Sequence, residues 1–169
     1  ELVQLAEKQG KILFIGHILQ YHSAVQTIKN ILQEGELGKL QYIYSNRFNL
    51  GKIRREENML WSFALHDISV ILSFVGEEPI DVTATAMNLL NPNIADTTIT
   101  NMKFSSGIGA HIFVSWLHPF KEQKMVIIGD RKMVIFDDTA PIDKMLMVYP
   151  NQISWKSGVP IPKKKKALQ

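Results

Sequence analysis

One stretch of the sequence, NMLWSFALHDISVILSFVG at residues 58–76, is strongly apolar but carries a histidine beside an aspartate near its middle. His66 is the residue there best suited to chemistry, because imidazole is the side chain that exchanges protons most readily near neutral pH. Ser62, Ser69 and Ser73 recur with His66 at spacings of four, three and four residues, which one face of a helix would collect. A solvent-facing helix carries lysines and glutamates at such positions, so small hydroxyls around one imidazole indicate a partly enclosed pocket.

The residues alone leave another interpretation of His66 open, in which it is a structural histidine hydrogen-bonded to a neighbouring strand. None of the five histidines has a second histidine four residues away or carboxylates at the spacing of a metal site, so we expect no bound metal. The chain has no cysteine, which excludes disulfides and thiolate ligands and fits a cytoplasmic protein.

The overall charge and hydropathy exclude two classes of partner. The net charge is +3, and the run PKKKK at residues 162–166 more than accounts for it. Because no aromatic residues are interleaved among these lysines, the run predicts a solvated tail and not a nucleic-acid site. No apolar run reaches the roughly 18 residues that a membrane-spanning helix needs, so we expect no membrane partner.

Two helices and a large sheet are predicted around the histidine. HSAVQTIKNILQEG at residues 22–35 has helical periodicity, with Ser23 as N-cap, and KLQYIYSNRFNL at 39–50 alternates like a strand. After the helix at 58–76, further strands are predicted at about 81–90, 97–104, 109–117, 124–129, 132–137 and 144–149. The links from residue 109 onward are too short for crossover helices, so these strands should pair antiparallel. The predicted fold is α+β, with two main helices packed on one face of a large, mostly antiparallel open sheet.

The second face of this sheet is predicted to be an interface. In GAHIFVSWL at residues 109–117, both alternating sets of side chains contain large apolar residues. Six of the seven methionines, all but Met59, fall on the predicted strands, and methionine adapts well to irregular packing surfaces. We expect a homodimer or homotetramer through the open sheet face. The alternative is a further helix of the same chain covering that face.

The first residues have a different pattern. ELVQLAEKQG predicts a short helix ended by Gly10, and KILFIGH resembles a buried parallel strand. A helix that leads into a buried strand is half of an α/β unit. We therefore expect residues 1–17 to be the remnant of an N-terminal Rossmann domain, residues 18–160 to be the α+β domain and residues 161–169 to be a basic tail.

Several segments resemble, in order, the glucose–fructose oxidoreductase, inositol dehydrogenase and rhizopine-catabolism family (Gfo/Idh/MocA). ELVQLAEKQGKILFIGHILQYHSA is similar to the family's last Rossmann helix and strand with the Gly-His segment that follows. ILQEGELGKLQYI is similar to its turn into the first sheet strand, LWSFALHDISVIL to the helix with its catalytic histidine, and VSWLHPFKEQKMVIIGDRKMVIFDD to its later strands. The resemblance implies an NAD(P)-dependent sugar oxidoreductase whose Rossmann domain binds most of the NAD or NADP.

The resemblance also implies roles for individual residues. His66 takes the place of the catalytic histidine, near the sugar hydroxyl or carbonyl that reacts. Arg47 would hold a substrate phosphate or carboxylate, with Tyr21 and Asp67 also at the substrate, although a surface arginine at a strand end is an equal alternative for Arg47. His17 would lie on the cofactor side. The family's catalytic lysine, in a Glu-Lys-Pro motif, would fall shortly before the first residue, so this chain alone is expected to be inactive.

Some positions depart from the family pattern. Many members have an aspartate one helical turn before the histidine and another three residues after it, where this chain has Ser62 and Ser69. An orienting carboxylate would then have to be Asp67 or come from elsewhere. The segment LWSFALHDIS at residues 60–69 is most similar to the branch of the family that acts on nucleotide-linked sugars. The competing hypothesis is a non-catalytic sugar-binding or oligomerisation module.

Overall fold

The computed structural model describes residues 1–150, 152–163 and 166–167. Its elements, in chain order, are the helix α1 (Leu2–Lys8), the 3-10 helix η1 (Ile18–Tyr21), α2 (Ser23–Gln33), β1 (Leu40–Phe48), the π-helix η2 (Leu60–Ala64), α3 (Leu65–Val75), β2 (Pro79–Met87), β3 (Thr97–Phe104), β4 (Gly109–Ser115), β5 (Glu122–Gly129), β6 (Met133–Asp137), β7 (Leu146–Tyr149), β8 (Gln152–Lys156) and β9 (Val159–Lys163).

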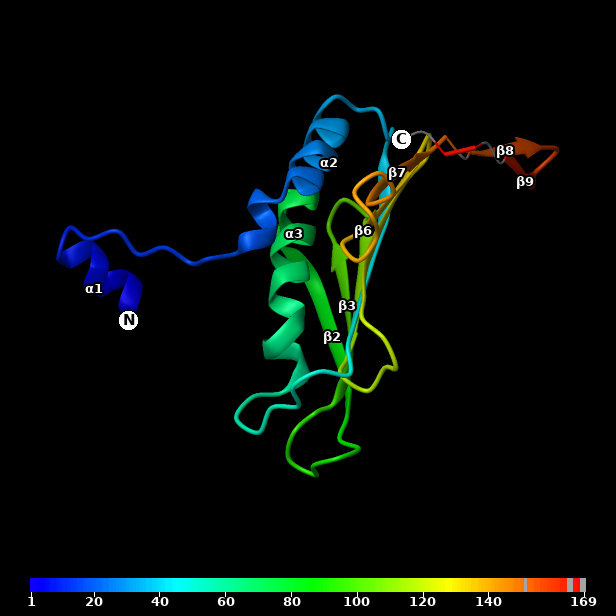
Figure 1. Cartoon of the computed structure of the whole chain (residues 1–169). Helices are drawn as coiled ribbons and strands as arrows, with labels where there is room; N and C mark the ends of the chain where they lie inside the picture. Colours follow the sequence, from blue (N-terminus) through cyan, green and yellow to red (C-terminus); the bar gives the residue numbers. More distant parts are fainter. Residues whose placement is uncertain (151, 164–165, 168–169) are drawn as a thin grey trace.

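The predicted α+β class is confirmed. Seven strands form one sheet in the order β2-β3-β4-β1-β5-β6-β7, and α2 and α3 lie together on one face of it (Figure 1). All neighbouring pairs are antiparallel except β1 and β4, which are parallel. The expectation that consecutive strands from residue 109 pair with each other is wrong for β4 and β5. The early strand β1 lies between them, so the link after β4 crosses the end of β1 instead of closing a hairpin.

The core lies between the sheet and its two helices. Ile43, Ile112 and Ile127 from three adjacent strands are fully buried against Ile28 of α2 and Ile71 of α3. Burying an aliphatic side chain of this size stabilises a fold by about 1.5–3 kcal/mol, so this layer fixes how α3 sits over β1 and β4.

The helix that carries His66 begins with an irregular turn. Its first turn is the π-helix η2, which holds more residues per turn than an α-helix and so rotates the side chains that precede it. Trp61 in this turn is 60% exposed, whereas Val70 and Phe74 of α3 are buried against the sheet. The helix ends as predicted, at Gly76 with a φ of 77°. The predicted N-cap of α2 is also wrong, because His22 and not Ser23 caps it: Nδ1 of His22 accepts the Ala24 N–H at 3.2 Å.

Both ends of the described chain project from this layered body (Figure 1). After α1, residues 11–17 form no strand with any described residue, and the side chains of Leu13, Phe14 and Ile15 are exposed. The predicted strand has no neighbour here with which to exchange backbone hydrogen bonds. At the other end β8 and β9 form a hairpin, so residues 161–163 of the predicted tail are in β9, and Lys164 and Lys165 lie outside the described residues.

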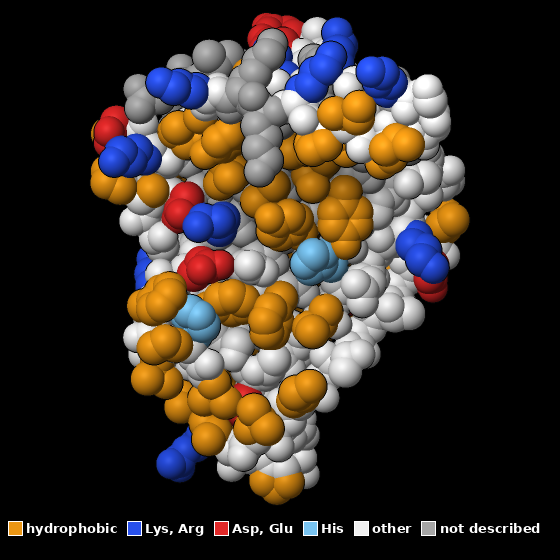
Figure 2. Space-filling view, turned by 90° about the vertical axis from the view of Figure 1, so that its right-hand side faces the viewer, with side chains coloured by type: hydrophobic (Ala, Val, Ile, Leu, Met, Phe, Trp, Pro, Cys, Tyr) orange, Lys and Arg blue, Asp and Glu red, His pale blue; other side chains and the backbone are white. Residues whose placement is uncertain are grey.

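The face of the sheet away from the helices is broadly apolar, as Figure 2 shows. Tyr42 and Tyr44 of β1 point to this face with His111 and Phe113 of β4, whereas their alternating neighbours face the helices. The His111 ring is stacked on Tyr44 at 5.3 Å between ring centroids, and its Nδ1 lies 2.7 Å from the Tyr42 hydroxyl. The methionines are divided between the faces, since Met102 and Met125, among others, belong to the core. Among the described helices, none is long and apolar enough to cross a membrane.

Candidate functional site

His66 lies in the first turn of α3, immediately after the π-helix, and its side chain is half-buried. Nδ1 of the ring is buried and has no hydrogen-bond partner in the part of the chain that the structure describes. Because the ring as a whole is only half-buried while Nδ1 is fully enclosed, the opposite edge, with Nε2, is the one that a ligand can reach. A sealed core histidine would have both nitrogens satisfied inside the protein.

The surroundings of His66 keep it neutral. Burial is the largest cause that lowers the pKa of His66 below its ordinary value of 6.5, and the positive charge of Arg47 lowers it further. The carboxylate of Asp67 acts in the opposite direction, and His17 adds a small lowering effect on the pKa. The imidazole is therefore unprotonated at pH 7 and able to accept a proton, which is what a general base needs.

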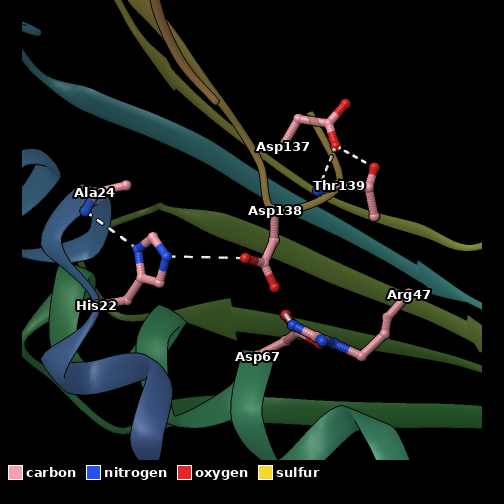
Figure 3. Close-up of polar contacts among 7 residues, drawn as sticks. All are labelled: His22, Ala24, Arg47, Asp67, Asp137, Asp138 and Thr139. Carbon is pink, nitrogen blue, oxygen red and sulfur yellow. Dashed lines mark hydrogen bonds and ion pairs between the residues drawn. The ribbon is translucent and has the colours of Figure 1, made fainter. Parts of the chain in front are cut away.

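Arg47 of β1 and Asp67 in the first turn of α3 form a buried ion pair between the two elements (Figure 3). Nε of Arg47 donates to Oδ2 of Asp67 at 2.7 Å and Nη2 donates to Oδ1 at 3.1 Å, a bidentate arrangement. The residues are 8% and 2% exposed, respectively. Both were expected at the substrate, but these donors and acceptors are occupied by each other. The pair joins the end of β1 to α3 and sets the electrostatic field at the neighbouring His66.

The segment before α2 lies on the outer side of α3. Nε2 of Gln20 donates to the carbonyl oxygen of Ser69 at 2.6 Å, and Nζ of Lys29 donates to Oε1 of Gln20 at 2.8 Å, so η1 is fixed to the serine-bearing face of α3. His17 is half-buried, and a positive charge on its ring would lower the pKa of His66. Tyr21 is 70% exposed in η1. Tyr21 is therefore free to meet a ligand or another part of the protein.

A second polar centre was not foreseen from the sequence. The buried carboxylate of Asp96 accepts the indole N–H of Trp116 at 2.7 Å and the backbone N–H groups of Leu89 and Leu90 at 2.7 and 2.8 Å. Asp96 lines a cavity of about 470 Å³ together with Arg54, Arg55 and side chains from the loops at residues 53–55 and 90–94. In the sequence, the pair of arginines at residues 54–55 was the feature that could have pointed to this cavity.

The charges of this cavity are nearly balanced. Nε of Arg54 already contacts a carboxylate oxygen of Glu57 at 2.9 Å, and Asp96 adds a further negative charge. The cavity is therefore not a strong anion site. Across residues 1–150, 152–163 and 166–167, no three histidine, aspartate or glutamate side chains come together in a way that could hold a metal ion.

The described geometry is that of an α+β domain in which one half-open histidine lies on a helix above a large sheet, beside a buried ion pair. Residues 25–135 match the model of the GFO/IDH/MocA C-terminal domain, and the chain belongs to this family. The resemblance found in the sequence is thereby confirmed, and the matched region contains both His66 and the ion pair.

Two characterised relatives are similar to most of the chain. The chain is 26% identical over 94% of its length to UDP-N-acetylglucosamine 3-dehydrogenase of Acidithiobacillus ferrooxidans, and it covers 49% of that protein. It is 25% identical over 81% of its length to 2,7-anhydro-N-acetylneuraminate hydratase of Mediterraneibacter gnavus, covering 40% of that protein. The chain thus spans about half the length of the curated relatives it matches.

Solved structures share the fold. The Acidithiobacillus dehydrogenase GnnA superposes on 99% of the chain with a TM-score of 0.75 at 21% identity, and the chain covers 52% of it. The WlbA dehydrogenase of Bordetella pertussis, solved with NADH and UDP-GlcNAcA, superposes on 85% of the chain with a TM-score of 0.72 at 18% identity, and 47% of it is covered. At these identities the likeness establishes the fold alone.

Proposed function

We propose that this chain is the substrate-binding and catalytic-histidine domain of an NAD(P)-dependent oxidoreductase that acts on a sugar. The observation that carries the proposal is the state of His66: its inner nitrogen is enclosed, its outer edge is accessible and its pKa is lowered, so it is neutral at pH 7. That is the state required of a group that takes a proton from a sugar hydroxyl. The ion pair of Arg47 with Asp67 holds the first turn of α3 in position for this step.

The chain's own residues do not fit the phosphates of a dinucleotide. The sequence has no GxGxxG fingerprint, and the positive-φ glycines Gly35, Gly76 and Gly107 end helices or close a hairpin turn. We therefore place most of the NAD(P) contacts on a Rossmann domain of which residues 1–17 form the last part. The exposed apolar side chains of that segment support this placement, because a neighbouring sheet would cover them. His17 is the residue of this chain that we place on the cofactor side.

We further propose that the substrate is a nucleotide-linked sugar. The support is the similarity to a relative named for UDP-N-acetylglucosamine and to WlbA, whose structure holds UDP-GlcNAcA. Tyr21, exposed on η1 next to the histidine face of α3, is the aromatic side chain that we place at the substrate.

The test is a measurement of turnover in the whole polypeptide. His66→Ala should lower kcat with UDP-linked sugars and NAD or NADP by about 10²–10⁴-fold, the usual contribution of a general base. Ser73→Ala is the matched control, because Ser73 is exposed on the same helix and its hydroxyl donates to the Val70 carbonyl of that helix at 2.8 Å. A His66→Ala protein with wild-type turnover would refute the assignment. An unrelated domain encoded before residue 1, in place of a glycine-rich βαβ unit and a Glu-Lys-Pro motif, would favour the non-catalytic sugar-binding module.

A second candidate is a lyase or hydratase that uses the same histidine. The relative named as a hydratase, at 25% identity, is the observation that favours it. Proton transfer at Nε2 serves either reaction. Net accumulation of reduced nicotinamide during turnover identifies the dehydrogenase. Product formation with no net change in reduced nicotinamide identifies the hydratase.

The open sheet face, which comprises Tyr42, Tyr44, His111 and Phe113 with their apolar neighbours, is the surface through which we propose that two copies associate. Its aromatic residues are only partly buried in a single chain, and Figure 2 shows apolar side chains gathered in patches over this face with a few charged side chains among them. A flat, mixed aromatic and aliphatic surface is suited to contact with a second copy of itself about a two-fold axis.

A further inference from the structure

Two unsatisfied polar atoms lie one helical turn apart at the candidate site. Oγ of Ser62 and Nδ1 of His66 are both buried, and neither has a hydrogen-bond partner within the described ranges. Leaving a buried donor or acceptor unpaired is destabilising, so such atoms are almost always satisfied in folded proteins. Each of the two atoms therefore requires a partner beyond the hydrogen bonds that the described residues make.

The other serines of this helix face behave differently. Oγ of Ser69 donates to the carbonyl oxygen of His66, and Oγ of Ser73 donates to that of Val70, both at 2.8 Å. Bonding of this kind to a carbonyl one turn earlier is the usual arrangement for serine inside a helix. Ser62 makes no such bond in the part of the chain described, so its hydroxyl is free to serve the histidine.

The π-helix improves the alignment of the two side chains. Four residues of an α-helix overshoot a full turn of 3.6 residues, by about 40°. Ser62 lies inside η2, where the wider turn reduces this overshoot and places its side chain more nearly in line with that of His66. Side chains four residues apart have Cβ atoms about 5–6 Å apart, a span that a rotated hydroxyl or one ordered water molecule closes.

We propose that Ser62 is the positioning residue of His66: its hydroxyl oxygen accepts the Nδ1–H of the ring, directly or through one water molecule, and so keeps the lone pair on Nε2. This inference rests on the proposed function, in which Nε2 meets the substrate hydroxyl. When Nε2 takes up the proton of that hydroxyl, the Nδ1–H bond to Ser62 is retained and the ring becomes an imidazolium.

A neutral partner has a consequence for pH. Serine does not stabilise the imidazolium as a carboxylate would, so the pKa of His66 stays low. The other charged or titratable groups that act on this ring are Arg47, Asp67 and His17, and the first two largely neutralise each other as an ion pair. Ser62 is thus the position at which a single substitution changes the protonation of His66 without breaking that pair.

The direct test is nitrogen-15 NMR of His66 in this chain, which reports the ring tautomer and the pKa without any turnover. We expect the Nδ1–H tautomer in the wild type, a mixture of tautomers in Ser62→Ala, and retention of the wild-type tautomer in Ser62→Thr. Ser62→Asp should raise the pKa of His66 by about 1–3 units. Ser73→Ala is the control and should leave the spectrum unchanged. Wild-type tautomer populations in Ser62→Ala, or an unshifted pKa in folded Ser62→Asp, would overturn the inference.

Turnover of the whole polypeptide separates this inference from the proposed function. If both hold, the acid limb of the kcat profile moves to higher pH in Ser62→Asp, in step with the pKa from NMR. If the NMR changes occur but the pH profile does not move, Ser62 positions His66 and the catalytic role of His66 fails.

Discussion

The buried ion pair between Arg47 and Asp67 gives the sharpest quantitative prediction. Removing one partner of such a pair leaves an uncompensated buried charge, which costs about 3–5 kcal/mol. We expect Asp67→Asn and Arg47→Met each to lower the free energy of unfolding by this amount. For a domain of this size, that corresponds to a fall in Tm of about 6–20 °C.

The double variant distinguishes the cost of an orphaned charge from the value of the pair itself. Because Arg47→Met with Asp67→Asn leaves no buried charge, its loss should be smaller than the sum of the two single losses by about 2 kcal/mol or more. Equilibrium unfolding in urea, followed by the fluorescence of the buried Trp116, measures all three variants.

The matched control is the exposed pair between Lys103 and Asp81, whose charged atoms lie 3.5 Å apart with side chains 74% and 50% exposed. Asp81→Asn should change stability by less than about 1 kcal/mol. If Asp67→Asn is as mild as Asp81→Asn, and the double variant is additive, the pair is not desolvated in solution and its role in fixing α3 is refuted.

Three further predictions concern other parts of the fold. Burial lowers the pKa of His111 below 6.5, so the unfolded state takes up a proton at a higher pH than the folded state, and stability falls as the pH drops below about 6.5. His111→Gln should therefore reduce the fall in Tm between pH 7.5 and 5.5. An unchanged dependence of Tm on pH would contradict this. Tyr44→Lys should convert the associated protein to monomer in analytical ultracentrifugation, whereas an unchanged sedimentation coefficient would exclude the open sheet face as the contact. Gly129→Ala should destabilise the fold, because its new Cβ would lie 2.2 Å from the Leu37 carbonyl oxygen; Gly16→Ala, with no atom within 4 Å, is the thermal-unfolding control.

The identity and limits of most elements follow from local patterns. Helical spacing and Gly76 predicted where the histidine helix ends, and period-two alternation predicted the strands, because side-chain periodicity and turn chemistry depend on residues close together in the chain. For the same reason, GAHIFVSWL at residues 109–117 indicated that apolar side chains lie on both faces of the sheet. The expected strand at residues 11–17 did not form, since a strand needs a neighbour that local sequence cannot supply.

Long-range pairing decided the remainder. Local links suggested that β4 and β5 would pair, yet β1 lies between them, because strand order depends on the whole packed sheet. The α+β class, the family and the choice of His66 as the candidate catalytic group all followed from local patterns and the order of the motifs. The pairing of Arg47 with Asp67, twenty residues along the chain, became visible only in the folded arrangement, because a desolvated arginine takes the nearest buried carboxylate as its partner. The π-helix at Leu60–Ala64 was likewise settled by packing, since nothing in its five residues distinguishes a π turn from an α turn.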